Sequence, residues 1–335
     1  IDENDNLWTW GWNYNGQLGD NTKINSLVPI QIMSGTKFKI IAAGQTYNLA
    51  IDIDGNLWTW GSNGYGQLGN GKTTDSLVPI QIMNGTKFKA ISANQFHSLA
   101  IDTDGNLWTW GDNGYGELGN GTTKKSLVPI QIMSGTKFKA VAACQIHSLA
   151  IDENNNLWVW GGNSKGQLGN DSTTSSLVPI KIIEETKITN ISSGLQYNLV
   201  LDESGNLWAW GNNSKGQLGN NSTTNSLIPI QIMNSIKFKY IDGGSNHSLA
   251  IDSEGNLWTW GDNSKGQLGN NSTTRSLIPI KIENNIKYKE VSAGGFHSIA
   301  LDESGNVWTW GENGTTGKLG NGTTTNSLVP TKIKF

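Results

Sequence analysis

Histidine is scarce in this chain, and its spacing raises the question of catalysis or metal binding. One position of a repeated motif holds histidine in four copies and tyrosine in two: His97, His147, His247, His297, Tyr47 and Tyr197. Histidine can serve as a general base or as a metal ligand, but a site of either kind, repeated by symmetry, would not readily accept tyrosine. We therefore predict buried rings that hydrogen-bond a neighbouring loop backbone, because buried polar groups need partners.

Acidic residues gather in short runs that superficially look like calcium-binding loops. The runs at 52–56 and 102–106 have the pattern D-x-D-G-N, but their glycine comes too early and the distant bidentate glutamate is missing. We interpret them as turns, in which glycine adopts positive φ and aspartate bonds its own backbone. Phosphate-loop, dinucleotide, nucleophile-elbow and paired zinc-ligand motifs do not occur in the sequence. We predict no catalytic residue, no metal, no cofactor and no enzyme activity.

Tryptophan is the most conspicuous residue type, with 15 in the chain. All but one belong to W-x-W-G pairs, which recur every 50 residues from Trp8 and Trp10 to Trp308 and Trp310. Residues two apart on a strand face the same side, so we predict that the paired rings pack between repeat units and have no reactive role. Trp12 stands outside the pairs. Its equivalents in the other copies suit solvent, so we expect it to be an exposed anchor.

The 50-residue period runs through the whole chain and defines the elements that position these residues. In one unit, four segments are short, rich in β-branched or aromatic residues and bounded by turn formers; they lie at 88–93, 97–102, 106–111 and 126–132. The proline of the fourth segment cannot donate to a ladder, which predicts an edge strand. Four antiparallel strands repeated about seven times predict an all-β fold, a seven-bladed β-propeller.

We predict one propeller domain over residues 1–335. Its repeats would span 1–50, 51–100, 101–150, 151–200, 201–250, 251–300 and a truncated 301–335.

The order of the motifs resembles one known family. G-x-x-H-S-L-A is followed by D-x-x-G-N-L-W-x-W-G, then by G-Q-L-G and then by P-I. This succession resembles the regulator of chromosome condensation repeat, over essentially the whole chain. The resemblance implies a seven-bladed propeller. It does not select one function, because propellers of this family serve in guanine-nucleotide exchange, light sensing, ubiquitin-ligase scaffolding and adhesion.

The first predicted blade has only its third and fourth strands, at 6–11 and 26–32. The C-terminal Lys-Phe aligns with the residues that begin a first strand in the next repeat. Unpaired sheet edges promote association between chains. We therefore expect that the parent protein continues beyond Phe335 or begins before Ile1. The alternative is that another chain, or a second copy of this one, donates the missing strands, which would be self-association through the incomplete blade.

Composition argues against several classes of partner. The formal net charge is -3 and charged residues make up 15% of the chain, so we predict neither nucleic-acid binding nor membrane insertion. The single cysteine, Cys144, lies in an apolar stretch and is predicted to be an inert core residue. Near-identical units rich in Asn, Lys and Ile indicate recent duplication in a low-GC genome. That favours a bacterial protein outside the cell or at its surface over a cytoplasmic one.

The copies differ most in two loops of each unit, between the first and second strands and between the third and fourth. Both loops lie on one side of an antiparallel blade, and apolar side chains there are costly unless a partner covers them. Near-neutral drift in surface loops is the alternative explanation. The hypothesis is a protein-binding face with an aromatic half and a more basic half, and its candidate residues are Trp12, Tyr14, Tyr65, Phe96, Tyr115, Ile146, Lys165, Lys215, Lys265 and Phe296.

The sequence therefore predicts a non-catalytic interaction scaffold with a protein partner. A guanine-nucleotide exchange factor for a small GTPase is one alternative; it would need a specialised insertion, and the only irregularity is one extra residue near Thr315. A carbohydrate-binding lectin is another, which would use the Trp and Asn residues of the loops.

Overall fold

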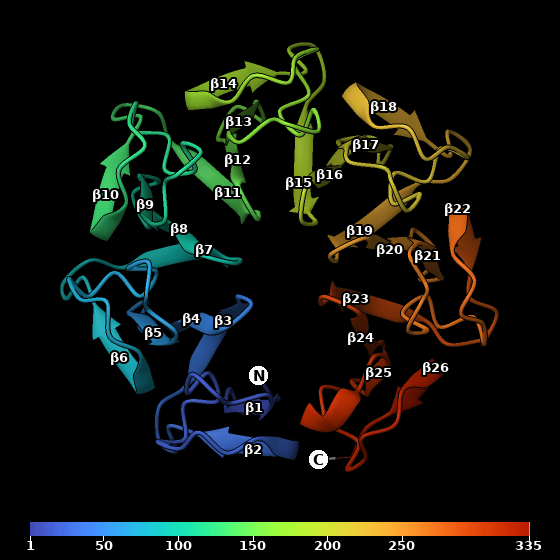
Figure 1. Ribbon diagram of the computed structural model, residues 1–335, viewed down its shortest axis with the longest axis horizontal. Helices are drawn as coiled ribbons and strands as arrows, with labels where there is room; N and C mark the ends of the chain where they lie inside the picture. The colour runs from blue at the N-terminus through green and yellow to red at the C-terminus, as the bar shows by residue number, and fades with distance from the viewer. Residues whose placement is uncertain (335) are drawn as a thin grey trace. The chain divides into compact units, whose positions relative to one another are not determined.

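The computed structural model describes residues 1–334, and its regular structure is almost entirely β (Figure 1). Within these residues the one helical element is a 3-10 turn, η1 (Gly314–Thr316), which forms where the last repeat carries its extra residue. None of the described segments is an apolar helix of membrane-spanning length.

Each complete blade is an antiparallel meander of four strands, in which every strand pairs with the next along the chain. The first strands are β3 (Phe38–Ala43), β7 (Phe88–Ala93), β11 (Phe138–Ala143), β15 (Ile188–Ser193), β19 (Phe238–Gly243) and β23 (Tyr288–Ala293). The second strands are β4 (Tyr47–Asp52), β8 (His97–Asp102), β12 (His147–Asp152), β16 (Tyr197–Asp202), β20 (His247–Asp252) and β24 (His297–Asp302).

The third strands carry the W-x-W pairs and are β5 (Leu57–Gly61), β9 (Leu107–Gly111), β13 (Leu157–Gly161), β17 (Leu207–Gly211), β21 (Leu257–Gly261) and β25 (Val307–Gly311). The fourth strands are β6 (Ser76–Ile82), β10 (Ser126–Ile132), β14 (Ser176–Ile182), β18 (Ser226–Ile232), β22 (Ser276–Lys281) and β26 (Ser327–Lys332). We number these sheets blade 2 (β3–β6) to blade 7 (β23–β26). Blade 1 has two described strands, β1 (Leu7–Gly11) and β2 (Ser26–Ile32), as the strand count predicted.

Blade 3 shows why these segments form strands in this order. All six residues of β8 are buried, because a central strand with sheets packed on both faces has no polar side. β10 lies at the end of the sheet order, and its register with β9 shifts between Ser126 and Ile130, the stretch that contains Pro129. The predicted edge position of the proline strand is therefore confirmed.

The chain packs as two compact units, each with its own core. The first comprises Ile1–Gly162 and Ser175–Lys181, and the second comprises Asn163–Thr174 and the chain from Ile182 onward. In the first unit a core cluster between blades 3 and 4 contains Leu99, Phe138 and Trp160. In the second, the cluster between blades 5 and 6 contains Tyr197, Phe238 and Trp260. Within each unit, apolar cores therefore lie between neighbouring sheets.

The two tryptophans of each pair differ in burial and in hydrogen-bond partner. In blades 2 to 7 the second is buried almost completely, as in Trp110 and Trp160, and its indole Nε1 donates to a carbonyl of the preceding blade. For Trp160 the acceptor is Glu117 O at 2.6 Å. The first is half-buried. Trp158 Nε1 donates to Asp152 Oδ2 of its own blade at 3.0 Å, and its ring packs on the core shared with blade 3. Packing between blades is thus confirmed within the first unit, and the second ring of the pair is the more deeply buried.

Candidate binding surface

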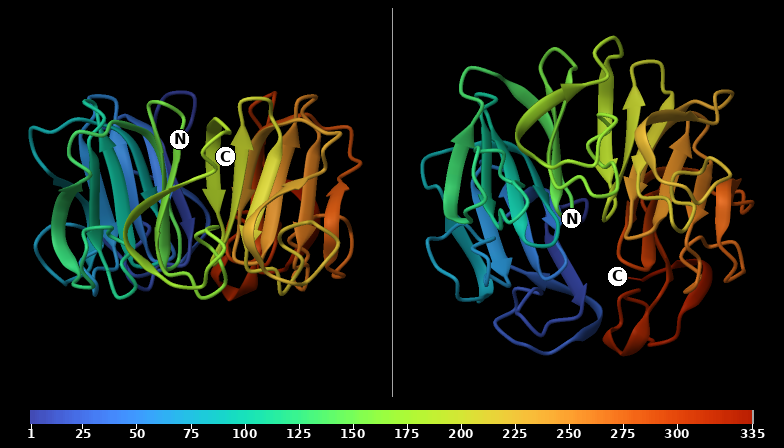
Figure 2. Two further views of the ribbon diagram at one scale, coloured as in Figure 1. Left: turned by 90° about the horizontal axis from the view of Figure 1, so that it is seen from above. Right: turned by 45° about the horizontal axis from the view of Figure 1, so that its top comes forward.

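Antiparallel strands alternate in direction, so the first-to-second and third-to-fourth loops of a blade lie at one end of it. We call this the long-loop end, because the third-to-fourth loops run from 62 to 75 in blade 2 and over the equivalent residues in the other blades. Figure 2 shows that the strands of a blade run between loops at its two ends. All ten residues predicted to bind a partner lie in loops at the long-loop end.

A buried asparagine organises each long loop. In blade 3, Asn113 Nδ2 donates to Asn120 Oδ1 and to the carbonyls of Thr122 and Lys124, at 2.9–3.2 Å, and Asn113 Oδ1 accepts Leu118 N at 2.9 Å. Asparagine occupies this position in all seven copies: Asn13, Asn63, Asn113, Asn163, Asn213, Asn263 and Asn313. Sequence reasoning missed this role, although an identical polar residue in every copy was the available signal. The loops are therefore fixed by their own side chains.

The glutamine of G-Q-L-G holds the tip of the same loop. Gln67 Oε1 accepts Tyr65 N at 2.9 Å, and Gln167 Oε1 accepts Lys165 N at 2.8 Å. Both glutamines are almost completely buried. Blade 3 carries Glu117 instead, whose Oε2 accepts Tyr115 N at 2.8 Å. The backbone of the tip residue is thus fixed, while its side chain is free to differ from blade to blade.

Aromatic rings are displayed on these fixed loops in the first unit. The exposed fractions are 42% for Trp12, 67% for Tyr14, 42% for Tyr65 and 55% for Tyr115, while Phe96 is half-buried. We call these five residues the aromatic patch. Two pairs of these rings are in contact. Trp12 stacks on Tyr14 with 6.4 Å between the ring centroids. The ring centroid of Tyr65 lies 4.4 Å from that of Phe96, which belongs to the first-to-second loop of the next blade. Contact between the rings restricts their movement, which makes them suitable anchors for a partner.

The remaining predicted residue of the first unit, Ile146, packs against the long loop of its own blade. It is half-buried, and a Cβ built on Gly162 would lie 2.7 Å from Ile146 Cδ1. Its side chain therefore covers the start of the neighbouring long loop.

The predicted residues of the second unit are exposed. Lys165, Lys215 and Lys265 stand at long-loop tips, where each backbone N–H donates to the glutamine two residues later. Phe296 is 36% exposed on the first-to-second loop of blade 7.

Two of the histidines, His97 and His247, lie between blades, and the hydrogen-bond partner of each ring differs from the prediction. His97 Nε2 meets Ser148 Oγ of the next blade at 2.9 Å, and His247 Nε2 meets Ser298 Oγ at 3.0 Å. A serine hydroxyl, and not a loop backbone, is therefore the partner. Burial lowers the pKa of His247 to about 3, with a further contribution from His297. The ring is neutral at physiological pH.

Replacing His247 with tyrosine should make the protein less sensitive to acid. The folded state keeps His247 neutral, whereas the unfolded chain protonates it near pH 6.5, so its contribution to stability is present above pH 6.5 and lost as the pH falls. By pH 5 this amounts to about 2 kcal/mol. Tyrosine already fits this position as Tyr197, and Gly244 leaves room for a ring as Gly194 does.

Urea unfolding of wild type and His247→Tyr at pH 7 and pH 5 measures this loss. The difference in free energy of unfolding between the two pH values should be about 2 kcal/mol smaller in the variant. An equal loss in both proteins would show that His247 is protonated in the folded state.

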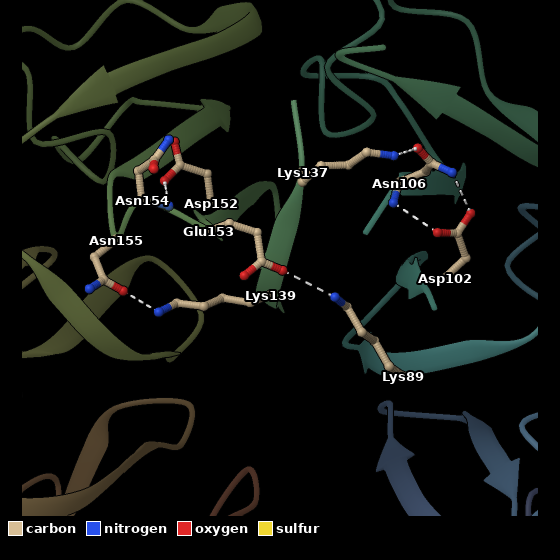
Figure 3. Close-up of polar contacts among 9 residues, drawn as sticks. All are labelled: Lys89, Asp102, Asn106, Lys137, Lys139, Asp152, Glu153, Asn154 and Asn155. Atoms are coloured by element: carbon tan, nitrogen blue, oxygen red, sulfur yellow. Dashed lines mark hydrogen bonds and ion pairs between the residues drawn. The ribbon is translucent and has the colours of Figure 1, made fainter. Parts of the chain in front are cut away.

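The opposite end of the blades contains turns, lysine–asparagine hydrogen bonds and an ion pair (Figure 3). Asp102 accepts the backbone and side-chain N–H groups of Asn106 at 2.8 Å, and Lys137 Nζ donates to Asn106 Oδ1 at 2.8 Å. Lys89 pairs with Glu153 of the next blade at 3.2 Å. The D-x-D-G-N runs thus form the predicted turns. Within residues 1–334, no group of three or more His, Cys, Asp or Glu side chains is placed to hold a metal ion.

A shallow depression of about 440 Å³ lies at this end, between Gly135–Lys137 and Asp152–Asn154. Its two carboxylates are already engaged, because Asp152 accepts hydrogen bonds from Asn156 and Trp158, and Glu153 pairs with Lys89. Burial would raise the pKa of Asp152, but these hydrogen bonds outweigh it and lower the pKa. The depression is therefore a weaker candidate for a binding surface than the aromatic patch.

Four-stranded antiparallel blades with cores between neighbouring sheets define a β-propeller, and solved structures agree. Prp20p from Saccharomyces cerevisiae has a TM-score of 0.89 at 24% identity, with 100% of this chain and 87% of that chain covered. Human WBSCR16 has a TM-score of 0.88 at 20% identity, covering 99% and 94%. The ectodomain of the Arabidopsis thaliana receptor kinase ACR4 has a TM-score of 0.55 at 14% identity, covering 92% and 89%. These likenesses establish the propeller fold.

Family models identify the family to which the chain belongs. A model of the RCC1-like domain matches residues 131–335, and a model of the regulator of chromosome condensation (RCC1) repeat matches residues 4–51, 54–101 and 104–151. The chain belongs to the regulator of chromosome condensation repeat family. Comparison with curated proteins found no match.

Proposed function

We propose that this protein is a non-enzymatic interaction module that binds a protein partner through the aromatic patch. The observation that carries the proposal is the display of Trp12, Tyr14, Tyr65 and Tyr115 at 42–67% exposure on loops that buried side chains hold in place. Large rings on a fixed backbone lose little conformational entropy when a partner covers them, which makes them effective anchors.

Relatives support a protein as the ligand. Yeast Prp20p is described by its binding to Gsp1p and histones, and yeast RCC1 (Prp20) has been solved bound to Kap60. The formal charge of -3 gives this chain no general attraction for polyanions. We therefore favour a protein surface that brings apolar groups to the rings.

The test uses substitutions that the chain itself supplies. Trp12→Ser, Phe96→Asn and Tyr115→Lys copy the residues found at the same positions in other blades, Ser62, Asn246 and Lys165, so the fold should be retained. The triple variant should bind its partner at least about thirtyfold more weakly, since the loss of even one anchor ring costs about 2 kcal/mol or more. Affinity capture followed by titration of the purified partner measures the change.

Ile53→Thr is the matched control. Ile53 is 52% exposed at the opposite end of blade 2, and threonine occupies its position in blade 3 as Thr103. Capture should survive this change. Full capture by the folded triple variant, or no capture by wild type, would overturn the proposal.

Two alternatives are tested by separate experiments. A guanine-nucleotide exchange factor would accelerate nucleotide release from a small GTPase; we expect none, since the one irregular loop forms only the short turn η1. A lectin would retain glycans on an array and lose them in the triple variant.

A further inference from the structure

Asparagine followed by glycine is a pair of residues that can react with itself. The backbone nitrogen of the glycine attacks the carboxamide carbon of the asparagine, and the absent side chain leaves that approach open. Ammonia leaves and a succinimide forms, and water then opens the ring to aspartate or isoaspartate. The overall change is hydrolysis of a carboxamide to a carboxylate and ammonia. The chain contains eight such pairs, at 15–16, 63–64, 70–71, 84–85, 113–114, 120–121, 313–314 and 321–322.

Seven of these pairs have an asparagine that the fold holds in place. Three asparagines are the fully buried organisers of long loops, Asn63, Asn113 and Asn313. Three more have a carboxamide oxygen that accepts hydrogen bonds from an organiser and from the backbone two residues further on, and these are Asn70, Asn120 and Asn321. The seventh, Asn15, donates from Nδ2 to Asp75 Oδ2 at 3.1 Å. Reaction at any of them requires these bonds to break first.

Asn120 shows that exposure alone does not make a pair reactive. Its side chain is exposed, yet Oδ1 accepts Asn113 Nδ2 at 3.2 Å and Thr122 N at 3.1 Å. The nucleophile is also engaged, because Gly121 N donates to Leu177 O of the next blade at 2.9 Å. Both reacting groups of this exposed pair are therefore fixed by hydrogen bonds.

The pair at 84–85 lies in the turn between β6 and β7, and both of its residues are exposed. One bond closes the turn, from Thr86 N to Met83 O at 3.0 Å. Within the part of the chain that the structure describes, neither the Asn84 carboxamide nor Gly85 N takes part in a hydrogen bond. Gly85 has a φ of +95°, and a Cβ built on it would meet nothing within 4 Å. Both reacting groups are therefore unengaged and accessible to water.

We propose that Asn84 is a site of self-modification, which deamidates through a succinimide with Gly85 while the other Asn-Gly pairs of the folded protein stay intact. The product gains a carboxylate at the end of blade 2 opposite the aromatic patch. The turn accommodates this charge, because blade 5 carries Glu184 at the same position. The fraction that opens to isoaspartate belongs to the substrate class of isoaspartyl carboxyl methyltransferases. This inference does not depend on the proposed binding function.

Incubation of the folded full chain at pH 8, followed by mass spectrometry of its tryptic peptides, measures the reaction at each site. Asn84 should deamidate at least about tenfold faster than Asn70 and Asn120, because those two react only after local opening of their loops. In concentrated urea, which removes the folded loops, the three sites should react at similar rates. Methyl transfer from S-adenosylmethionine by a purified isoaspartyl methyltransferase measures the isoaspartate formed.

Asn84→Ser is the matched variant. Ser34 and Ser134 occupy the equivalent position and precede glycines with φ of 98° and 97°, so the turn should be retained. The folded variant should accumulate little isoaspartate. Three results would each overturn the proposal: equal rates at Asn84 and Asn120 in the folded protein, isoaspartate undiminished in the variant, or an Asn84 that stays intact when folded but reacts in urea.

Discussion

Replacing Trp160 with alanine is expected to lower the free energy of unfolding by about 3–5 kcal/mol. The ring is fully buried among Leu99, Ile132 and Phe138, so its loss leaves a cavity between blades 3 and 4. It also removes the indole N–H that Glu117 O accepts at 2.6 Å. Urea unfolding followed by circular dichroism measures the change.

Trp158→Ala is the matched control, because it changes the same residue type on the same strand. This ring is half-buried, and its Nε1 bonds an aspartate of its own blade. We expect a smaller loss of about 1–2 kcal/mol. Equal losses in the two variants would contradict the division of roles within the W-x-W pair.

In wild type, we expect the free energy of unfolding to fall as the pH rises, because of Glu117. Glu117→Gln should remove this fall. Burial raises the pKa of Glu117 from 4.5 to about 7, and the nearby charge of Asp112 adds to the rise. Between these pH values the folded protein holds the proton and the unfolded chain has released it, so stability falls as the pH rises and levels off above pH 7. The full effect is about 3 kcal/mol.

Glutamine is the natural replacement, since it occupies this position in five copies and Gln67 accepts the tip N–H as Glu117 does. Urea unfolding at pH 5 and pH 8 should show that the free energy of unfolding of the variant rises relative to that of wild type by about 2.5 kcal/mol between the two pH values. Groups common to both proteins cancel in the difference. A difference that does not depend on pH would mean that Glu117 is ionised throughout.

The fold was predictable because one pattern repeats in every unit. Comparison of the copies gave the observed bounds of three strands of blade 3, at 88–93, 97–102 and 126–132. The third strand begins one residue later than predicted, at Leu107, because Asn106 N is bonded to Asp102 Oδ1 in the turn. The repeat period and the turn residues are local features, so both can be identified directly in the sequence.

The candidate site was predictable in part. Exposure of Trp12 followed from its polar equivalents in other copies, and the structure places it at 42%. The contact between Tyr65 and Phe96 could not be predicted, because the two rings come from loops of different blades. The role of Asn113 was also missed. Its presence in every copy was a signal, but asparagine is common in any turn, and its four partners could not be identified from the sequence.

The bonds between neighbouring blades connect residues that are close in the chain. Ser148 reaches back 31 residues to Glu117, Trp160 reaches back 43 residues to the same carbonyl, and Tyr47 reaches forward 50 residues to His97. A nascent chain can therefore complete each contact soon after the partner strand leaves the ribosome, without waiting for distant segments. Folding during synthesis should proceed blade by blade, with each finished sheet acting as the template for the next.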